Sequence, residues 1–322
     1  MALMVLHSPE EWAARFGTEG RTALSVGNFD GLHLGHQKLL RLLVARARER
    51  GQRAVVITFD PHPLRLLRPE QAPRLIQTPA QRLAGIEQMG VDAAIVLRFD
   101  RAFSLISPRD FMERILSDCL RAGTILVGEN FCFGHRGAGN VALLAEFGRT
   151  RGFDVEIVPP VEVDGRVISS TAIRTAIASG DVANAIPLLG RAFSLTGEIR
   201  QGEGRGRTIL FPTLNFLPEQ ELLPKLGVYA TESAVGGTAF FSVTNVGTRP
   251  TFDGHGVVVE SHLFSFSDRV TSGPMEVRFH ARLREERKFS GPEALREQIA
   301  RDMSEAESYF EESRRKLGSG TS

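Results

Sequence analysis

The chain has few of the features that mark secreted or membrane proteins. It has 2 cysteines, Cys119 and Cys132, among 322 residues, which excludes a disulfide framework and fits a reducing cytoplasm. No apolar run approaches the roughly 18 residues that a membrane helix needs, and the N-terminus lacks the basic region and apolar core of a signal peptide. We therefore expect a cytoplasmic protein with no membrane partner.

An excess of charge of either sign is also missing. The formal net charge is +1, with 24% charged residues, so a nucleic acid is not expected as a partner. Nothing in the sequence indicates an oligomer. Tyrosine and tryptophan are scarce, at 2 Tyr and 1 Trp against 21 Phe. We expect most of the phenylalanines in the core and a few stacked on a flat ligand.

Two familiar phosphate-binding patterns, Gly-x-Gly-x-x-Gly and Gly-x-x-x-x-Gly-Lys-Ser/Thr, are absent at the first strand, Thr22–Val26. This argues against a dinucleotide-binding loop and a P-loop. The strand leads instead into Gly27-Asn-Phe-Asp-Gly-Leu-His-Leu-Gly-His36 and a helix predicted over 36–50. Free N–H groups at a helix N-terminus bind phosphate, and His33 and His36 add donors there. The alternatives are a surface histidine pair and a zinc site completed by Asp30 and His62.

The first half alternates predicted strands and helices, which implies a parallel sheet covered by helices on both faces. Ligands bind such sheets at the carboxyl ends of the strands, where Asn28, Asp60 and Gly128 lie. After Leu188 the pattern changes to short strands separated by turns, which predicts a small antiparallel barrel closed by a C-terminal helix. We therefore expect domains at 1–187 and 188–322.

Three further motifs of the first half carry candidate side chains. Phe59-Asp-Pro-His-Pro63 turns tightly after a strand, and Val127-Gly-Glu-Asn-Phe-Cys-Phe-Gly134 offers an amide and a stacking face at another strand end. Ile168-Ser-Ser-Thr-Ala-Ile-Arg174 begins a helix. Its hydroxyls, its N–H groups and Arg174 can contact a phosphate there. Taken singly, these motifs are also compatible with a plain turn and a plain helix cap.

In the second half, Gly202-Glu-Gly-Arg-Gly-Arg207 precedes Pro212-Thr-Leu-Asn215. The glycines suit a loop over a nucleotide. Thr213 and Asn215 lie two residues apart, so in an extended segment both side chains face the same way and can hold Mg²⁺ and phosphate oxygens. Glu260 lies in an apolar strand, either as an outward-facing residue or as a buried base.

Together, in this order, these motifs resemble the bifunctional prokaryotic riboflavin kinase/FMN adenylyltransferase (FAD synthetase) family. The C-terminal part of the resemblance also rests on Leu188-Leu-Gly-Arg191, Gly227-Val-Tyr229, Asn245-Val-Gly247, Arg249-Pro-Thr-Phe252 and Val259-Glu-Ser261. The resemblance implies an α/β nucleotidyltransferase domain of the His-x-Gly-His type and a β-barrel riboflavin kinase domain. The substrates it implies are riboflavin, FMN and ATP, with Mg²⁺ as cofactor and FMN and FAD as products.

The resemblance also implies roles for particular residues of the first domain. His33, His36 and Arg174 would stabilise the transition state of adenylyl transfer. The ATP site would be completed by Gly27, Asn28, Phe29, Asp30, Gly35, Asn130, Ser169 and Ser170. The flavin would lie against Phe59, His62, Pro63, Phe131 and Arg136.

In the kinase domain the resemblance implies that Thr213 and Asn215 hold Mg²⁺ and ATP and that Glu260 is the catalytic base. Gly202, Gly206 and Arg207 would contact ATP. This chain has Leu210 and Leu214 where the family motif has Gly and Ala, which puts the kinase rate and flavin affinity in question. Other readings are a different His-x-Gly-His adenylyltransferase, a shortened class I aminoacyl-tRNA synthetase, and a flavin-binding or regulatory protein with reduced kinase turnover.

Overall fold

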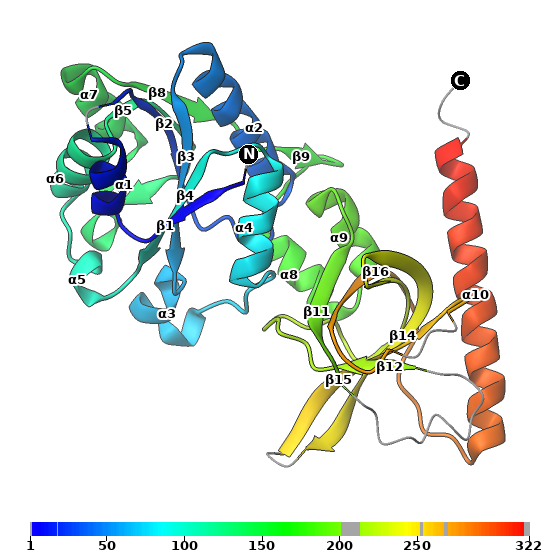
Figure 1. Ribbon diagram of the computed structural model, residues 1–322. Helices are drawn as coiled ribbons and strands as arrows, with labels where there is room; N and C mark the ends of the chain where they lie inside the picture. Colours follow the sequence, from blue (N-terminus) through cyan, green and yellow to red (C-terminus); the bar gives the residue numbers. More distant parts are fainter. Residues whose placement is uncertain (1, 18, 201–212, 252–253, 267–269, 319–322) are drawn as a thin grey trace. The chain divides into compact units, whose positions relative to one another are not determined.

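A computed structural model describes residues 2–17, 19–200, 213–251, 254–266 and 270–318 (Figure 1). Its packing divides the chain into two compact units, Met1–Ser170 and Thr171–Ser322, which are described separately. The domain limits of 1–187 and 188–322 stay a prediction. Within the described residues, no helix is both long enough and apolar enough to cross a membrane.

The first unit is built on a parallel sheet, which confirms the α/β class. Its strands pair in the order β1-β4-β3-β2-β5-β8, every neighbouring pair parallel. Their bounds are β1 Met4–Leu6, β2 Thr22–Val26, β3 Arg53–Asp60, β4 Ala93–Arg98, β5 Ala122–Gly128 and β8 Asp154–Val158. Short antiparallel pairs join β6 (Cys132–Phe133) to β7 (Gly139–Asn140) and β9 (Glu162–Val163) to β10 (Arg166–Val167).

Helices cover both faces of this sheet. They are α1 Pro9–Phe16, α2 Leu34–Glu49, α3 Pro63–Leu67, η1 Pro69–Gln71, α4 Pro79–Gln88, α5 Arg101–Ser104, α6 Pro108–Asp110, η2 Phe111–Cys119, η3 His135–Gly137 and α7 Val141–Arg151. Alternate residues of β2 supply the two cores. Ala23 packs with Leu40 and Leu43 of α2, whereas Leu24 packs with Trp12 and Leu116 on the opposite face. This alternation buries every residue of β2.

Two helices differ from the sequence expectation. The helix after the histidine loop begins at Leu34 rather than His36, because the His33 side chain caps it. The helical segment that begins after Ser107 is not regular: α6 is followed by a π-helix, η2, at the end of which Leu120 N donates to Ile115 O, five residues back. The helices α1 and α9 (Val182–Leu189) were not predicted.

The second unit is a closed antiparallel barrel, in the order β11-β12-β15-β14-β13-β16, with β16 also pairing with β11. Its strands are β11 Phe193–Arg200, β12 Leu214–Phe216, β13 Gly227–Val235, β14 Thr238–Thr251, β15 Gly254–Leu263 and β16 Pro274–Arg284. The helix α8, Ser170–Ser179, precedes α9, and α10, Pro292–Gly318, follows the barrel. The structure thus confirms the predicted barrel with its C-terminal helix.

Hydroxyl groups form an unbroken chain inside this barrel. Hydrogen bonds join Ser233 to Ser242 at 2.8 Å, Ser242 to Thr231 at 2.8 Å, Thr231 to Thr244 at 2.6 Å, and Thr244 to Ser261 at 2.7 Å. All of these residues are 0% exposed. Each hydroxyl therefore satisfies a neighbour that would otherwise be buried without a partner.

The helix α10 covers one outer face of the barrel. Ala306 and Phe310 pack on Val228, Ala230 and Val243. One turn before Ala306 in the same helix, Asp302 is buried. Its carboxylate accepts hydrogen bonds from Arg284 Nε at 2.9 Å and Arg284 Nη2 at 2.8 Å. This ion pair fixes α10 to the end of β16.

We expect Asp302→Ala to destabilise the barrel unit, because it leaves the Arg284 guanidinium largely buried without its anion. The expected loss of unfolding free energy is about 3 kcal/mol. The control is Arg301→Ala, which breaks the exposed pair with Glu297 on the same helix and should cost less than about 0.5 kcal/mol. Denaturation followed by the near-UV circular dichroism of Tyr229 and Tyr309 measures both. Equal effects of the two substitutions would contradict this account.

Candidate active sites

The histidine loop lies where the strand order of the parallel sheet reverses. β2 pairs with β3 on one side and with β5 on the other, and the chain runs from the carboxyl end of β2 directly into Gly27–His33. The carboxyl end of β5 leads into the loop with Asn130. Ligands of doubly wound sheets bind at this crevice. The fold therefore brings the predicted nucleotide loop to the expected edge.

His33 and His36 form a stacked pair at the start of α2. Their ring centroids lie 3.7 Å apart with 19° between the planes, and His33 Nδ1 accepts a hydrogen bond from His36 N at 3.4 Å. An accepting Nδ1 leaves the proton of neutral His33 on Nε2. Burial, and secondarily the His33 ring, hold the pKa of His36 well below its usual range. His36 is therefore a neutral imidazole at pH 7.

The backbone of the loop is held in an uncommon conformation. Phe29 and Leu32 adopt φ values of 50° and 41° and are buried at 2% and 3% exposure. Left-handed backbone at non-glycine residues is costly and gathers at functional sites. At Gly35, an added Cβ would lie 3.1 Å from His33 Cε1 and Nδ1. A side chain there would press on the His33 ring, which explains the glycine between the histidines.

Other predicted nucleotide residues hold the loop through specific contacts. The buried Asp30 carboxylate accepts hydrogen bonds from Ile76 N at 3.0 Å and Gln77 N at 3.3 Å. Ser170 Oγ donates to Asp30 O at 2.9 Å. Asp30 thus fastens its loop to the segment before α4, a role that its motif did not reveal.

The remaining predicted residues of this site are spread over several elements. Gly27 extends β2, with its N–H donating to Ile57 O at 3.0 Å. Asn130 is exposed in the turn that follows β5, and Ser169 directly precedes α8. Arg174 lies one turn into α8, in the second unit. Its approach to the histidine loop stays a prediction.

Two of the predicted flavin residues belong to one series of contacting aromatic rings. Phe59 contacts Phe103 at 5.9 Å between centroids, Phe103 contacts Phe111 at 6.5 Å, Phe111 contacts Phe133 at 5.4 Å, and Phe133 stacks on Phe131 at 5.4 Å. The π-helix η2 supplies Phe111. These rings give the carboxyl edge of the sheet an apolar wall.

The other flavin candidates lie in turns beside this wall. His62 is buried and caps α3, its Nδ1 accepting from Leu64 N at 3.2 Å, and Pro63 is the first residue of that helix. Arg136 is exposed, with φ 56° in the turn η3. The strand ends at 59 and 128 therefore carry an apolar wall and an exposed cation.

In the barrel, Thr213, Asn215 and Glu260 come together. Thr213 Oγ1 donates to Glu260 Oε1 at 2.8 Å, and Asn215 and Glu260 are direct cross-strand partners between β12 and β15. Glu260 is half-buried, and Asn215 Oδ1 is buried with no partner. Thr213 Oγ1 and Asn215 Oδ1, with the Glu260 carboxylate beside them, are oxygen atoms of the kind that Mg²⁺ prefers as ligands.

Asn245, a direct neighbour of Glu260, was not predicted as a site residue, and neither was Glu286, which lies beside Gly247. Asn245 is the cross-strand partner of Glu260 on β14, and a Cβ at Gly247 would lie 2.4 Å from Glu286 Oε1 and 2.9 Å from Asn245 Nδ2. Asn245 stood in a motif of the resemblance without a role. Glu286 lies in the charged run 285–288, which looks like a solvated surface.

Leu214, which departs from the family motif, points away from this cluster. Side chains alternate along a strand, so Leu214 lies on the face opposite Thr213 and Asn215; its cross-strand partner Ser261 faces the barrel interior. Leu214 therefore does not crowd the oxygen cluster. Leu210 and the predicted ATP contacts Gly202, Gly206 and Arg207 lie outside the described residues.

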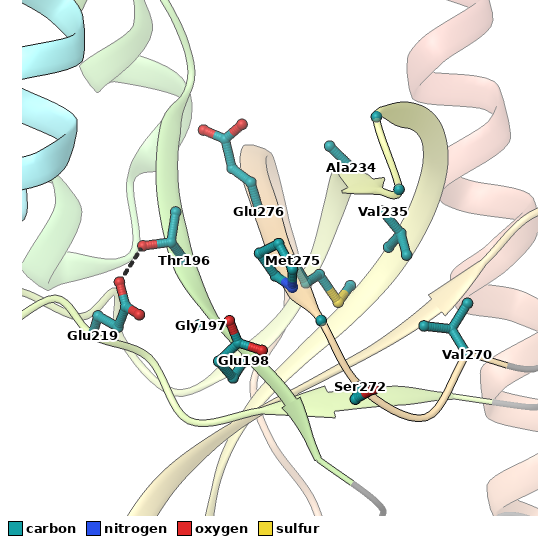
Figure 2. A pocket seen from close by; sticks show the side chains of 14 residues that line it. Thr196, Gly197, Glu198, Glu219, Ala234, Val235, Val270, Ser272, Met275 and Glu276 are labelled. Carbon is teal, nitrogen blue, oxygen red and sulfur yellow. Dashed lines mark hydrogen bonds between the residues drawn. The ribbon is translucent and has the colours of Figure 1, made fainter.

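A cavity of about 600 Å³ opens at another part of the barrel, between β11, the β13–β14 turn and the start of β16 (Figure 2). Apolar groups such as Val235 and Met275 line it, and Thr196 donates to Glu219 at 3.0 Å (Figure 2). Glu198 and Glu276 also face it. Because carboxylates repel polyphosphate, the three glutamates of this lining make the cavity a poor site for ATP phosphates.

The zinc alternative for the histidine pair finds no support in the structure. Among the residues described, no group of three or more His, Cys, Asp or Glu side chains is placed to hold a metal ion. The histidines are better described as donors at a helix N-terminus.

Comparison with known proteins assigns both units. The model of the FAD synthetase family matches residues 17–172, and that of the riboflavin kinase family matches residues 189–310. The two domains are thus those of an ATP-dependent transferase of flavin metabolism. Bifunctional riboflavin kinase/FMN adenylyltransferases of Escherichia coli and Bacillus subtilis are 35% and 34% identical, covering 89% and 91% of this chain and 92% and 93% of their own. The chain belongs to this family.

A solved structure extends the comparison to the whole fold. A protein from Streptococcus pneumoniae, titled a macrolide-efflux protein, matches with a TM-score of 0.83 and 28% identity over 94% of this chain and 98% of its own. These comparisons confirm the family that the sequence motifs predict and its two activities. The enzyme uses ATP to convert riboflavin to FMN and FMN to FAD.

The low pKa of His36 gives a testable pH dependence. The unfolded chain protonates this histidine near its ordinary pKa of 6.5, whereas the folded chain does not. Stability should therefore fall as the pH drops below about 6.5, by up to about 1.4 kcal/mol per pH unit from this group. Unfolding followed by the fluorescence of Trp12, the single tryptophan, reports the first unit. His36→Asn should show a shallower dependence between pH 7.5 and 5.5, and an unchanged one would contradict the assignment.

Proposed function

We propose that the two reactions occur at two separate sites, adenylyl transfer at the histidine loop and riboflavin phosphorylation at the Thr213–Asn215–Glu260 cluster. The observation that supports this division most strongly is the difference between the functional groups of the two clusters. The first cluster offers neutral donors and helix N–H groups, whereas the second offers a carboxylate among hydroxyl and amide oxygens. Each set suits one of the two reactions.

In adenylyl transfer an oxygen of the FMN phosphate forms a bond to the α-phosphorus of ATP, while the bond to the pyrophosphate oxygen breaks. The nucleophile is already ionised at neutral pH, so the site needs no base. It needs alignment and stabilisation of charge at the α-phosphate. His33, His36 and the N–H groups at the start of α2 supply these donors. The phenylalanine wall with Phe59 and Phe131 supports the flavin.

In phosphorylation the nucleophile is a neutral ribityl hydroxyl. Its oxygen forms a bond to the γ-phosphorus, ADP leaves, and the hydroxyl proton must be accepted. Glu260 is the base, and the Thr213 hydroxyl orients its carboxylate. The unpartnered Asn215 Oδ1 and Thr213 would hold Mg²⁺, which neutralises phosphate charge when bound.

Replacing both histidines should separate the activities. We expect His33→Ala with His36→Ala to lower FAD formation by about 10³-fold, because it removes the donors to the α-phosphate. FMN formation by the same chain should stay near the wild-type rate. Chromatography of flavins after incubation with riboflavin, ATP and Mg²⁺ measures both, and His7→Ala, at an exposed histidine of the same unit, is the control. Loss of both activities in a folded protein would refute separate sites.

A single atom exchange tests the kinase base. Glu260→Gln keeps the size of the side chain and removes the proton acceptor, so FMN formation should fall by about 10²–10⁴-fold. Adenylylation of supplied FMN should continue. The matched control, Glu305→Gln, alters an exposed glutamate of α10. Normal FMN formation by Glu260→Gln would show that the base lies elsewhere.

A further inference from the structure

Arg82 is a buried arginine that joins two strand ends. It lies on α4 and is 5% exposed. Its Nη1 donates to Asn28 O at 3.2 Å and its Nη2 donates to Phe59 O at 3.2 Å. Asn28 belongs to the loop that follows β2, and Phe59 lies near the end of β3. One guanidinium therefore bridges two neighbouring loops through their backbone.

Keeping a cation at this position is costly. Burial lowers the pKa of Arg82, and the carboxylates of Asp60 and Asp30 act in the opposite direction. Its Nε is buried without a partner. An apolar side chain would fill the same space without the desolvation penalty. The arginine therefore points to a benefit other than stability, and its planar fork of donors, which fixes two acceptors at once, supplies one.

The two bridged loops are the ones that the proposed function assigns to the two substrates. Asn28 lies in the loop that leads to His33 and His36, and Phe59 lies near the end of β3, just before the turn that leads to His62. The same helix is tied to the histidine loop a second time, because Asp30 accepts hydrogen bonds from Ile76 N and Gln77 N just before it. The helix α4 therefore fixes the separation of the nucleotide loop from the flavin loop.

We propose that Arg82 is a positioning residue for adenylyl transfer, which holds the ATP loop and the FMN loop in register so that the FMN phosphate meets the α-phosphorus in line. This inference rests on the proposed assignment of the two loops. Arg82 touches backbone carbonyls and acts through the residues that follow them. Transfer between two bound substrates depends on alignment, and a displacement near 1 Å can cost about 10²-fold in rate.

The principal test is Arg82→Lys, which keeps the charge but donates from one nitrogen and cannot bridge both carbonyls. We expect kcat/KM for FAD formation to fall by about 10²-fold, with FMN formation unchanged. The control is Arg48→Lys, which alters an arginine of the same unit that binds Asp92 at 2.7 Å on the surface. It should leave both rates within about twofold of the wild type.

Binding measurements separate positioning from a merely structural role. In the wild type, α,β-methylene-ATP should change the Kd for FMN, because the two hydrogen bonds of Arg82 link the two loops. In Arg82→Lys the Kd for FMN should be the same with and without this analogue. Trp12 fluorescence at the assay temperature confirms that the unit is folded. An unchanged coupling, or a kcat/KM within about twofold of the wild type, would overturn the proposal.

A second variant covers the case in which Arg82→Lys unfolds. In Arg82→Ala, added guanidinium ion at millimolar concentration should restore part of the FAD formation, whereas equal sodium chloride should not. Absence of rescue in a folded variant would overturn the proposal. The variant with both His33→Ala and His36→Ala separates this inference from the proposed function. If it still forms FAD, the histidine loop is not the adenylyl-transfer site. If it forms no FAD and Arg82→Lys remains fully active, only the positioning role of Arg82 fails.

Discussion

Backbone pairing between neighbouring strands brings together the chain segments on which both proposed sites are built. In the first unit, parallel pairing of β2 with β3 and β5 brings the ends of three strands to one edge, although these strands end at residues 26, 60 and 128 of the sequence. In the second unit, antiparallel pairing sets Asn215 and Asn245 on either side of Glu260. Side-chain chemistry refines these sites, but the strand register creates them.

The two proposed sites serve nucleophiles with different chemical needs, and each contains only a few functional groups. In the histidine loop the two rings stack, and burial keeps His36 neutral, so the proposed role of these rings is hydrogen bonding to phosphate. The barrel site keeps a carboxylate half-buried and holds it with the Thr213 hydroxyl. One nucleophile arrives as an anion and needs only alignment, whereas the other arrives neutral and must lose a proton. The residues at each site follow from that difference in substrate chemistry.

Much of the architecture was predictable, because periodicity and turn residues report local structure directly. The alternation of strands and helices predicted the parallel sheet, and the short β-rich runs after Leu188 predicted the barrel. The missed elements have physical reasons. The π-helix η2 reads as an ordinary helix in sequence, and α2 starts early because His33, a residue singled out for chemistry, also serves as its cap.

The candidate sites were predictable only where a motif is local. Thr213 and Asn215 could be placed on one face from their spacing alone. Arg82, Asn245 and Glu286 could not be found in this way, because their roles depend on which strand ends or neighbours the fold brings to them. Arg82 looks like any cation of an amphipathic helix, and only its burial against two carbonyl groups distinguishes it.

The hydroxyl chain inside the barrel has a consequence for how this unit can change over time. A slip of one residue in a strand moves each side chain to the opposite face, so a slip of β15 would bring Glu260 inside and Ser261 outside. Such a slip would break the chain that runs from Ser233 to Ser261. Replacing Ser242 alone would remove the hydroxyl partner of Ser233, and replacing Thr244 alone would remove that of Ser261. The hydroxyl-lined part of the barrel interior is therefore expected to tolerate substitution mainly in coordinated sets, in contrast to exposed outer positions away from α10 and from the Thr213–Asn215–Glu260 cluster.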